Sequence, residues 1–319
     1  MLSSTPGFNN RPHYSDNTLR IWDTETAAPV DVLHGHTSRI WDVASDRSGS
    51  MVASASGDGT VKVRDILSVG FVVFLCCQIW NLKEKNSCGF TLACHDSDVY
   101  TVQYHPGEIH VVTGGYDKTV RLLDINTGQV IKSFTGHQLS VSKCIFNPLG
   151  NLIISGSKDS TIKFWDIVSG LCIRTITSHL GEVTSVEMSA DGSKLLSSSK
   201  DNSNRLWDVR TTRPIRRLKG HQNTSRNFVR SGFAGKMVVG GSEDGIVYLW
   251  DQVTGEILQR LRGHRGIVYN AAWSAKQSLF VSCSDDRTVK TWWYDADMPL
   301  FSKGIPGRRG EACPERNAR

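Results

Sequence analysis

The sequence lacks the features that mark several large classes of protein. The apolar run from Val69 to Cys77 is too short to span a membrane. No charged segment followed by an apolar core opens the chain, so we expect neither a secretory route nor a membrane contact. No Gly-rich loop follows a strand pattern and opens a helix, so SGSKDS and its relatives are turn glycines and not a nucleotide site.

Cysteine is present but unpatterned. The eight cysteines form no C-x-x-C pair and fall mostly inside strand-like segments. This usage is typical of reduced thiols, which predicts an intracellular protein, cytoplasmic or nuclear or both. The formal net charge of +6 is mild, and it permits an acidic partner without requiring nucleic acid.

What the chain does contain is a repeated unit, seen most clearly from Gly136 to Asp166. It opens with Gly-His, alternates through VSKCIF, turns at NPLGN, runs apolar through LIISGS, turns again and closes on TIKFWD. β-Branched and aromatic residues between turn residues predict three short strands.

The landmarks of this unit return along the chain. The Gly-His histidines from His95 to His264 follow one another at intervals of 42, 42, 42 and 43 residues, and a turn Asp comes 22 or 23 residues after each. An apolar or aromatic residue closes each unit six residues later. A period of 40 to 45 residues with these landmarks is the signature of a four-stranded propeller blade.

These residues make the chain resemble the WD-repeat β-propeller family from residue 13 to about residue 294. The resemblance implies an all-β fold with an irregular stretch at 1–12, a propeller at 13–298, and an outer-strand remnant with a disordered basic tail at 299–319. Counting the closing residues predicts seven blades: Trp22, Trp80, Leu123, Trp165, Trp207, Trp250 and Trp292.

Two units depart from the pattern. The first has only its closing and outer strands, so we expect an incomplete blade and a native start further upstream. The second carries an insert at 63–78, which places Arg64 where a Trp is expected and delays the Trp to Trp80. Removing Val63 to Gln78 restores DGTVKIWNL, and the ends of the insert suit a retained intron translated in frame; an ordinary loop insertion is the alternative.

In the resembled family, the histidine, the turn Asp, a strand Ser or Thr and the closing Trp form a hydrogen-bonded set within each blade. The matching positions here are His36, Asp58 and Trp80; His95 and Asp117; His137, Asp159 and Trp165; His179, Asp201 and Trp207; His221, Asp244 and Trp250; and His264, Asp286 and Trp292.

A His beside a carboxylate also occurs in catalytic triads, but a catalytic group is built once and this set recurs six times. We therefore interpret the sets as structural and predict no catalytic residue, no metal site and no cofactor.

The family often holds partner peptides at the third and fifth positions after the histidine and just before the turn Asp. Carried over, the expected binding face is Arg39, Trp41, Asp98, Tyr100, Tyr116, Lys158, Lys200, Arg226 and Tyr269. Trp, Tyr and Arg are the usual interface anchors.

Units four to six are also similar to the propeller scaffold subunit of histone H3 methyltransferase complexes. The two aromatics that clamp an arginine in that protein correspond to Ser142 and Val229 here, so the clamp is absent.

The sequence therefore predicts a non-catalytic scaffold or adaptor that binds peptide segments of protein partners in an intracellular complex. The alternative is a nucleic-acid-associated propeller in an RNA-processing or chromatin complex. It rests on Arg213, Arg216, Arg217, Lys219, Arg260, Arg262, Arg265, Arg308 and Arg309.

Overall fold

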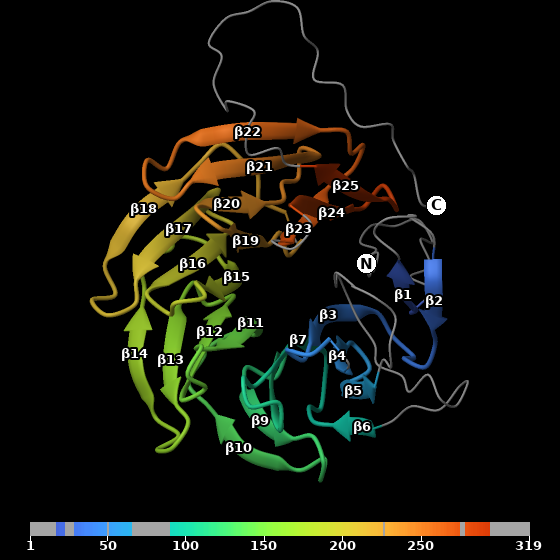
Figure 1. Cartoon of the computed structure of the whole chain (residues 1–319). Helices are drawn as coiled ribbons and strands as arrows, with labels where there is room; N and C mark the ends of the chain where they lie inside the picture. Colours follow the sequence, from blue (N-terminus) through green and yellow to red (C-terminus); the bar gives the residue numbers. More distant parts are fainter. Residues whose placement is uncertain are drawn as a thin grey trace, which may run out of the picture.

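The computed structural model describes residues 17–22, 29–49, 51–65, 90–225, 227–274 and 278–293. Every regular element in these ranges is a strand, and the strands form short antiparallel sheets arranged around a common centre (Figure 1). The predicted all-β propeller is confirmed. Among the described residues there is no helix long and apolar enough to cross a membrane.

Six sheets follow the repeat, and each is built from strands that are consecutive in the chain. Five have four strands and one has three. The inner strands, which surround the centre in Figure 1, are β3 (Ile40–Ser45), β7 (Val99–Tyr104), β11 (Val141–Phe146), β15 (Val183–Met188), β19 (Ser231–Ala234) and β23 (Val268–Ser274). The second strands are β4 (Met51–Ser56), β8 (His110–Gly115), β12 (Leu152–Ser157), β16 (Lys194–Ser199), β20 (Met237–Gly240) and β24 (Leu279–Ser284).

The closing strands carry the last landmark of each unit, and the outer strands lie in the links between units. The closing strands are β5 (Thr60–Asp65), β9 (Val120–Asp124), β13 (Ile162–Asp166), β17 (Ser203–Asp208), β21 (Ile246–Asp251) and β25 (Val289–Trp293). The outer strands are β6 (Phe90–Ala93), β10 (Val130–Phe134), β14 (Cys172–Ile176), β18 (Pro214–Leu218) and β22 (Ile257–Arg262).

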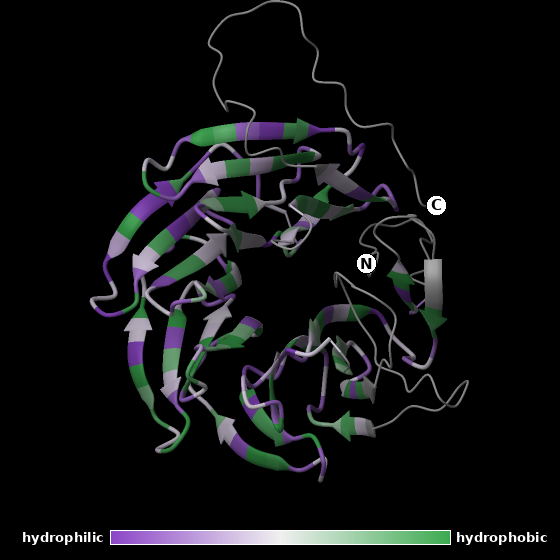
Figure 2. Ribbon diagram, in the orientation of Figure 1, coloured by the Kyte–Doolittle hydropathy of each residue, from purple (hydrophilic) through white to green (hydrophobic). Residues whose placement is uncertain are grey.

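Burial follows the position of a strand in its blade. Five of the six residues of β12 are buried, because this second strand is covered on both faces by neighbouring blades. In the outer strand β14 only Ile176 is buried. Figure 2 shows hydrophilic and hydrophobic residues mixed along the outer strands β14 and β18. The core therefore lies between adjacent blades, where Val112 of one blade packs in a cluster with Val141 and Trp165 of the next.

A seventh sheet has only two strands, β1 (Leu19–Trp22) and β2 (Pro29–Leu33). Leu19 and Ile21 pack in the cluster that contains the β3 blade, whereas Trp22 packs with Tyr269 and Leu279 of the β23 blade. This sheet thus contacts the blades on both sides of it. The described residues contain six blades of three or four strands, so the predicted count of seven is not confirmed.

The second unit closes on the segment that precedes the insert. Val61 to Asp65 of β5 pair with β4, and Arg64 pairs with Val52 as Trp165 pairs with Ile153 in the β11 blade. Trp80 and most of the predicted insert lie outside the described residues. The register therefore puts Arg64 at the position of the closing aromatic, while the retained-intron interpretation stays a prediction.

We expect deletion of Val63 to Gln78 to raise the thermal midpoint. The deletion brings Trp80 into the register position of Arg64, where a Trp can hydrogen bond Ser54 as Trp165 bonds Ser155. The added burial and hydrogen bond should contribute on the order of 2–4 kcal/mol. Thermal melts of the two chains measure the effect. A deletion variant that also carries Trp80→Ala is the control and should lose most of the gain; an unchanged midpoint in the simple deletion would mean that the insert is a tolerated loop.

Candidate functional site

The repeated histidine is held in the same way in most blades, and the β11 blade gives the pattern. Nδ1 of His137 lies 2.8 Å from Oδ2 of Asp159, and Nε2 lies 2.7 Å from Oγ of Ser155. The Trp165 indole nitrogen donates to the same Ser155 oxygen over 2.8 Å. Since a carboxylate only accepts, Nδ1 carries the proton, Nε2 accepts from the serine, and the serine accepts from the indole.

The turn that carries Asp159 is fixed by the same carboxylate. Its Oδ1 accepts from the backbone nitrogen of Thr161 at 2.9 Å and from the Thr161 hydroxyl at 2.6 Å. Ser160 between them has a φ of 65°, a left-handed conformation that a local Asp side chain stabilises. Burial would raise the pKa of Asp159, but the bonds from His137 and Thr161 outweigh it and hold that pKa well below its usual range. The carboxylate therefore remains charged.

The geometry of these sets matches a catalytic triad, but their environment does not. Ser155 has no exposed surface, and its oxygen already accepts from Trp165. A nucleophile needs access to a substrate, and this hydroxyl has none. The sets satisfy the polar groups of each blade interior.

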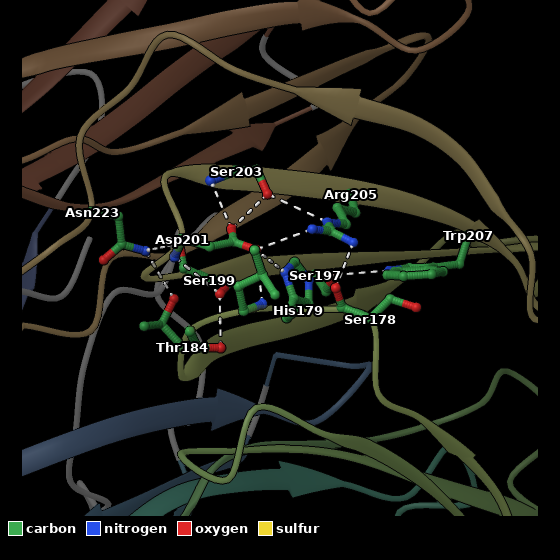
Figure 3. A network of polar contacts seen from close by, with 12 residues as sticks. Ser178, His179, Thr184, Ser197, Ser199, Asp201, Ser203, Arg205, Trp207 and Asn223 are labelled. Atoms are coloured by element: carbon green, nitrogen blue, oxygen red, sulfur yellow. Dashed lines mark hydrogen bonds and ion pairs between the residues drawn. The ribbon is translucent and has the colours of Figure 1, made fainter.

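The same contacts recur around the ring. The His179 set in Figure 3 joins Asp201, Ser197 and Trp207 and adds an ion pair between Arg205 and Asp201 of 3.1 Å. His95 binds Asp117 and Thr113 and has no Trp, because Leu123 closes that blade. The remaining sets are His36 with Asp58 and Ser54, and His264 with Asp286, Ser282 and Trp292.

The prediction for His221 is wrong. Both of its ring nitrogens are buried without a hydrogen-bond partner. Asp244 instead accepts from the Tyr248 hydroxyl at 2.7 Å, and the Trp250 indole donates to the backbone of Lys219 at 2.9 Å. The physical reason is in the sequence: Gly240, which pairs with Tyr248 as Ser155 pairs with Lys163, stands where the other blades have Ser or Thr.

Burial lowers the pKa of His221 to about 4. A histidine whose folded-state pKa lies below its unfolded value of about 6.5 contributes full stability above pH 6.5 and progressively less as the pH falls towards 4. The neutral, unpartnered ring is therefore a point of acid sensitivity in the β19 blade.

We expect His137→Leu and His221→Leu to change the free energy of unfolding by different amounts. The first leaves Asp159 and Ser155 without their partner and should lower the free energy of unfolding by about 2–4 kcal/mol. The second removes an unsatisfied group and should change it at pH 7 by less than about 1 kcal/mol. Between pH 7 and 5 the His221→Leu chain should gain about 2 kcal/mol relative to the parent. Urea unfolding at both pH values measures this; equal losses for both variants would contradict the assignment.

The structure brings five of the predicted binding-face residues together around the mouth of the ring. The Trp41 and Tyr100 rings meet edge to face with centroids 5.0 Å apart, and the Trp41 indole donates to Asp98 over 3.2 Å. The Arg39 guanidinium lies 4.9 Å from the Trp41 ring centroid, and the Lys158 ammonium lies 5.3 Å from that of Tyr100.

A residue that the sequence did not point to completes this group. The Phe228 ring lies 5.8 Å from Trp41 and 5.4 Å from Tyr100, although it belongs to the segment before β19. Lys158 also lies over it, at 5.4 Å. We call Arg39, Trp41, Tyr100, Lys158 and Phe228 the ring-face cluster.

The other predicted face residues are placed differently. Tyr116 is next to the cluster, since its backbone nitrogen donates to Asp98, and its side chain is 60% exposed. Lys200 pairs with Glu182 at 2.6 Å. Tyr269 is 8% exposed, about as buried as Tyr100 at 6%, and it packs with Trp22 of the two-stranded sheet and not with the cluster. Arg226 lies outside the described residues.

Below the cluster, a network of charges that sequence reasoning missed fills the ring centre. The Asp42 carboxylate is 1% exposed and accepts from Lys143 at 2.5 Å, from Thr101 at 2.8 Å and from Arg230. Burial would raise the pKa of Asp42, but Arg230 and Lys143 together lower it. Asp42, Thr101, Lys143 and Arg230, here called the channel network, come from four blades. The only sequence sign was the irregular stretch NTSRNFVRSGF in unit six.

We expect Asp42→Asn to destabilise the fold far more than its size suggests. It leaves Lys143 and Arg230 facing each other without their anion, which should cost about 3–5 kcal/mol. Chemical denaturation measures the loss, and Asp98→Asn is the matched control on the ring face with an expected cost below about 1 kcal/mol. Similar losses in both variants would show that the network does not hold the blades together.

The repeat and its geometry can now be set beside known proteins. A family model described as "Nucleolar protein 10-like, N-terminal domain", of the β-propeller type, matches residues 97–295, and the "WD domain, G-beta repeat" model matches residues 27–65. The chain belongs to this family of WD-repeat β-propellers. The likeness of its middle units to the histone methyltransferase scaffold stays a prediction.

Individual relatives are similar over parts of the chain. "Nuclear distribution protein nudF 1" of Talaromyces marneffei is 30% identical over 43% of this chain and 27% of its own length. "CCR4-associated factor 4 homolog" of Vanderwaltozyma polyspora is 27% identical over 37% of this chain and 18% of its own length. "Transcription initiation factor TFIID subunit 5" of Caenorhabditis elegans is 25% identical over 43% of this chain and 18% of its own length. The chain thus matches less than a third of the length of each of these relatives.

Proposed function

We propose that this chain is a non-catalytic scaffold that binds peptide segments of protein partners at the ring face, inside an intracellular complex of the cytoplasm or nucleus. The observation that carries the proposal is the ring-face cluster beside exposed Tyr116. Aromatic and cationic side chains gathered at the centre of a rigid surface are the usual anchors of protein interfaces. Two similar proteins are named as subunits of assemblies, TFIID subunit 5 and coatomer subunit beta'-2, which supports the same class of function.

The cluster is organised before any partner binds. Trp41 and Tyr100 start neighbouring inner strands, and Phe228 reaches them from the β19 blade, so each ring holds the others in place. Pre-ordered side chains lose little rotamer freedom on binding, which favours affinity. Tyr116 and the Lys158 ammonium then provide a hydroxyl, an apolar face and a positive charge for a peptide.

We further propose that the sheet of β1 and β2 is the outer half of a seventh blade. The pairing of Trp22 with Pro29, with a register shift just before Trp22, matches the pairing of Trp207 with Pro214 in a regular blade. Its position between the β3 and β23 blades supports the same interpretation. Pro299 to Ser302, the expected outer strand of the β23 blade, lie outside the described residues.

The alternative is nucleic-acid binding through the arginines of the outer strands. Arg216 and Arg217 of β18 and Arg260 and Arg262 of β22 are exposed, but they line the outer edge of the ring and not its face (Figure 1). Arg216 donates to the backbone of Val253, and Arg260 lies over Tyr248. A solvated basic edge accounts for these residues, so protein binding is the preferred function.

A double variant, Tyr116→Ala with Lys158→Ala, should lose partners while it keeps its thermal midpoint, because neither side chain is in the core. Affinity purification with quantitative mass spectrometry should recover at least about tenfold less of the specific partners. Val168→Ala, at a side chain 83% exposed in the turn after β13, is the control and should recover them fully.

The salt dependence of capture separates the two functions. Raising the salt from about 50 to 200 mM weakens a contact that rests on many phosphates by 10³-fold or more. Capture that resists this change and requires Tyr116 and Lys158 supports peptide binding. Capture that collapses with salt and is indifferent to both residues would overturn it in favour of nucleic acid.

A further inference from the structure

A cavity of about 260 Å³ lies at the end of the inner strands opposite the ring-face cluster. The last residues of β7, β11 and β15 form its walls, whereas Trp41 and Tyr100 of the cluster are second in their strands. Its lining includes Gln103, Pro106, Ile145, Phe146, Met188 and Glu187. The cavity is therefore separate from the proposed partner site.

The walls of this cavity are mostly apolar, but they contain one carboxylate. Glu187 is partly buried, and one of its oxygens accepts from the backbone nitrogen of Phe233 at 3.0 Å. In the described ranges no Lys, Arg or His nitrogen lies within 4.0 Å of the Glu187 carboxylate. Its charge is thus stabilised at hydrogen-bond distance by one neutral donor, the Phe233 backbone N–H.

The nearest compensating charge is already engaged. The Lys143 ammonium acts on Glu187 electrostatically, but it lies 2.5 Å from Asp42 in the channel network. Burial raises the pKa of Glu187 to about 7, while the Phe233 bond and Lys143 lower it only in part. Burial disfavours the charged form of this carboxylate, and a cation bound beside it would stabilise that form.

We propose that the Glu187 cavity binds the basic side chain, arginine or lysine, of a peptide segment of a partner protein. The aliphatic stem would lie against Ile145, Phe146 and Met188, and the cationic head would pair with Glu187. The cavity is smaller than the roughly 300–1,000 Å³ of pockets for whole small ligands, which favours one side chain as the occupant. Charge-assisted pairs of this kind are the strong hydrogen bonds of recognition sites.

Gly232 of the β19 blade lies against the Glu187 carboxylate and leaves room for it. A Cβ atom at this position would come within 2.8 Å of Oε2 of Glu187, so only glycine leaves the carboxylate its present place. The Phe233 nitrogen holds the other oxygen. The blade that supplies Phe228 to the ring face therefore also sets the carboxylate at the opposite face.

The test uses the full chain with ¹³C-methyl methionine, whose five methionines give a simple spectrum. Met188 lines the cavity, and Met51 and Met237 of other blades are internal references. Titration with n-butylguanidinium should shift the Met188 methyl signal with an affinity at least about tenfold higher than that of uncharged n-butylurea. A capped Gly-Arg-Gly peptide should shift the same signal, and capped Gly-Gln-Gly should not.

Glu187→Gln keeps the acceptor for Phe233 and removes the charge. It should abolish the preference for the guanidinium, whereas Glu182→Gln on the other face should leave that preference unchanged. Equal binding of the urea and the guanidinium, a preference that survives in Glu187→Gln, or no shift with any probe would each overturn the proposal. A response to butylguanidinium without one to the peptide would assign the cavity to small organic cations, which also overturns the proposal.

This outcome is independent of the ring-face function. The Tyr116→Ala and Lys158→Ala chain should retain the Met188 response, so either proposal can fail while the other stands.

Discussion

A buried carboxylate at the centre of the ring links blades that are not neighbours in the ring. Asp42 binds groups from the β7, β11 and β19 blades, and Arg230 reaches it from a position 188 residues away in the chain. Blades in such a fold pack side by side through apolar contacts, and these stabilise the fold without requiring one exact orientation of the side chains. The ion pairs of Asp42 do depend on orientation, because each forms only in one arrangement of the blades. They also position Trp41, the residue before Asp42, against Tyr100 and Phe228 at the ring face.

The other hydrogen-bonded sets lie within single blades. In most blades the His, Asp and Ser or Thr groups bond to one another. The β19 blade is the exception: Gly240 stands in place of the serine, Asp244 accepts from Tyr248, and the ring nitrogens of His221 have no partner. The sequence spacing predicted these sets because they are local and periodic. The prediction failed at His221 because it was made from the His, Asp and Trp positions, and these three are complete there.

The contacts between blades were beyond sequence reasoning for a physical reason. Phe228, Arg230 and Lys143 act across the ring, and no periodicity links residues 101 or 188 positions apart. Position within a repeat also could not tell which neighbours Tyr269 contacts. Tyr269 and Tyr100 are both buried, but Tyr269 packs with Trp22 of the β1 and β2 sheet, whereas Tyr100 packs with Trp41 and Phe228. The carboxylate of Glu187 was likewise hidden, since its setting depends on Gly232 and Phe233 of the next blade.

The contacts at the ring centre bear on how the two proposed sites would be used. Phe228 of the β19 blade contacts Trp41 and Tyr100 at the mouth, and Lys143 and Arg230 pair with Asp42 across the ring. The proposed Glu187 site lies at the other end of the inner strands. Segments bound at the two proposed sites would therefore approach from opposite faces and would not compete for the same surface.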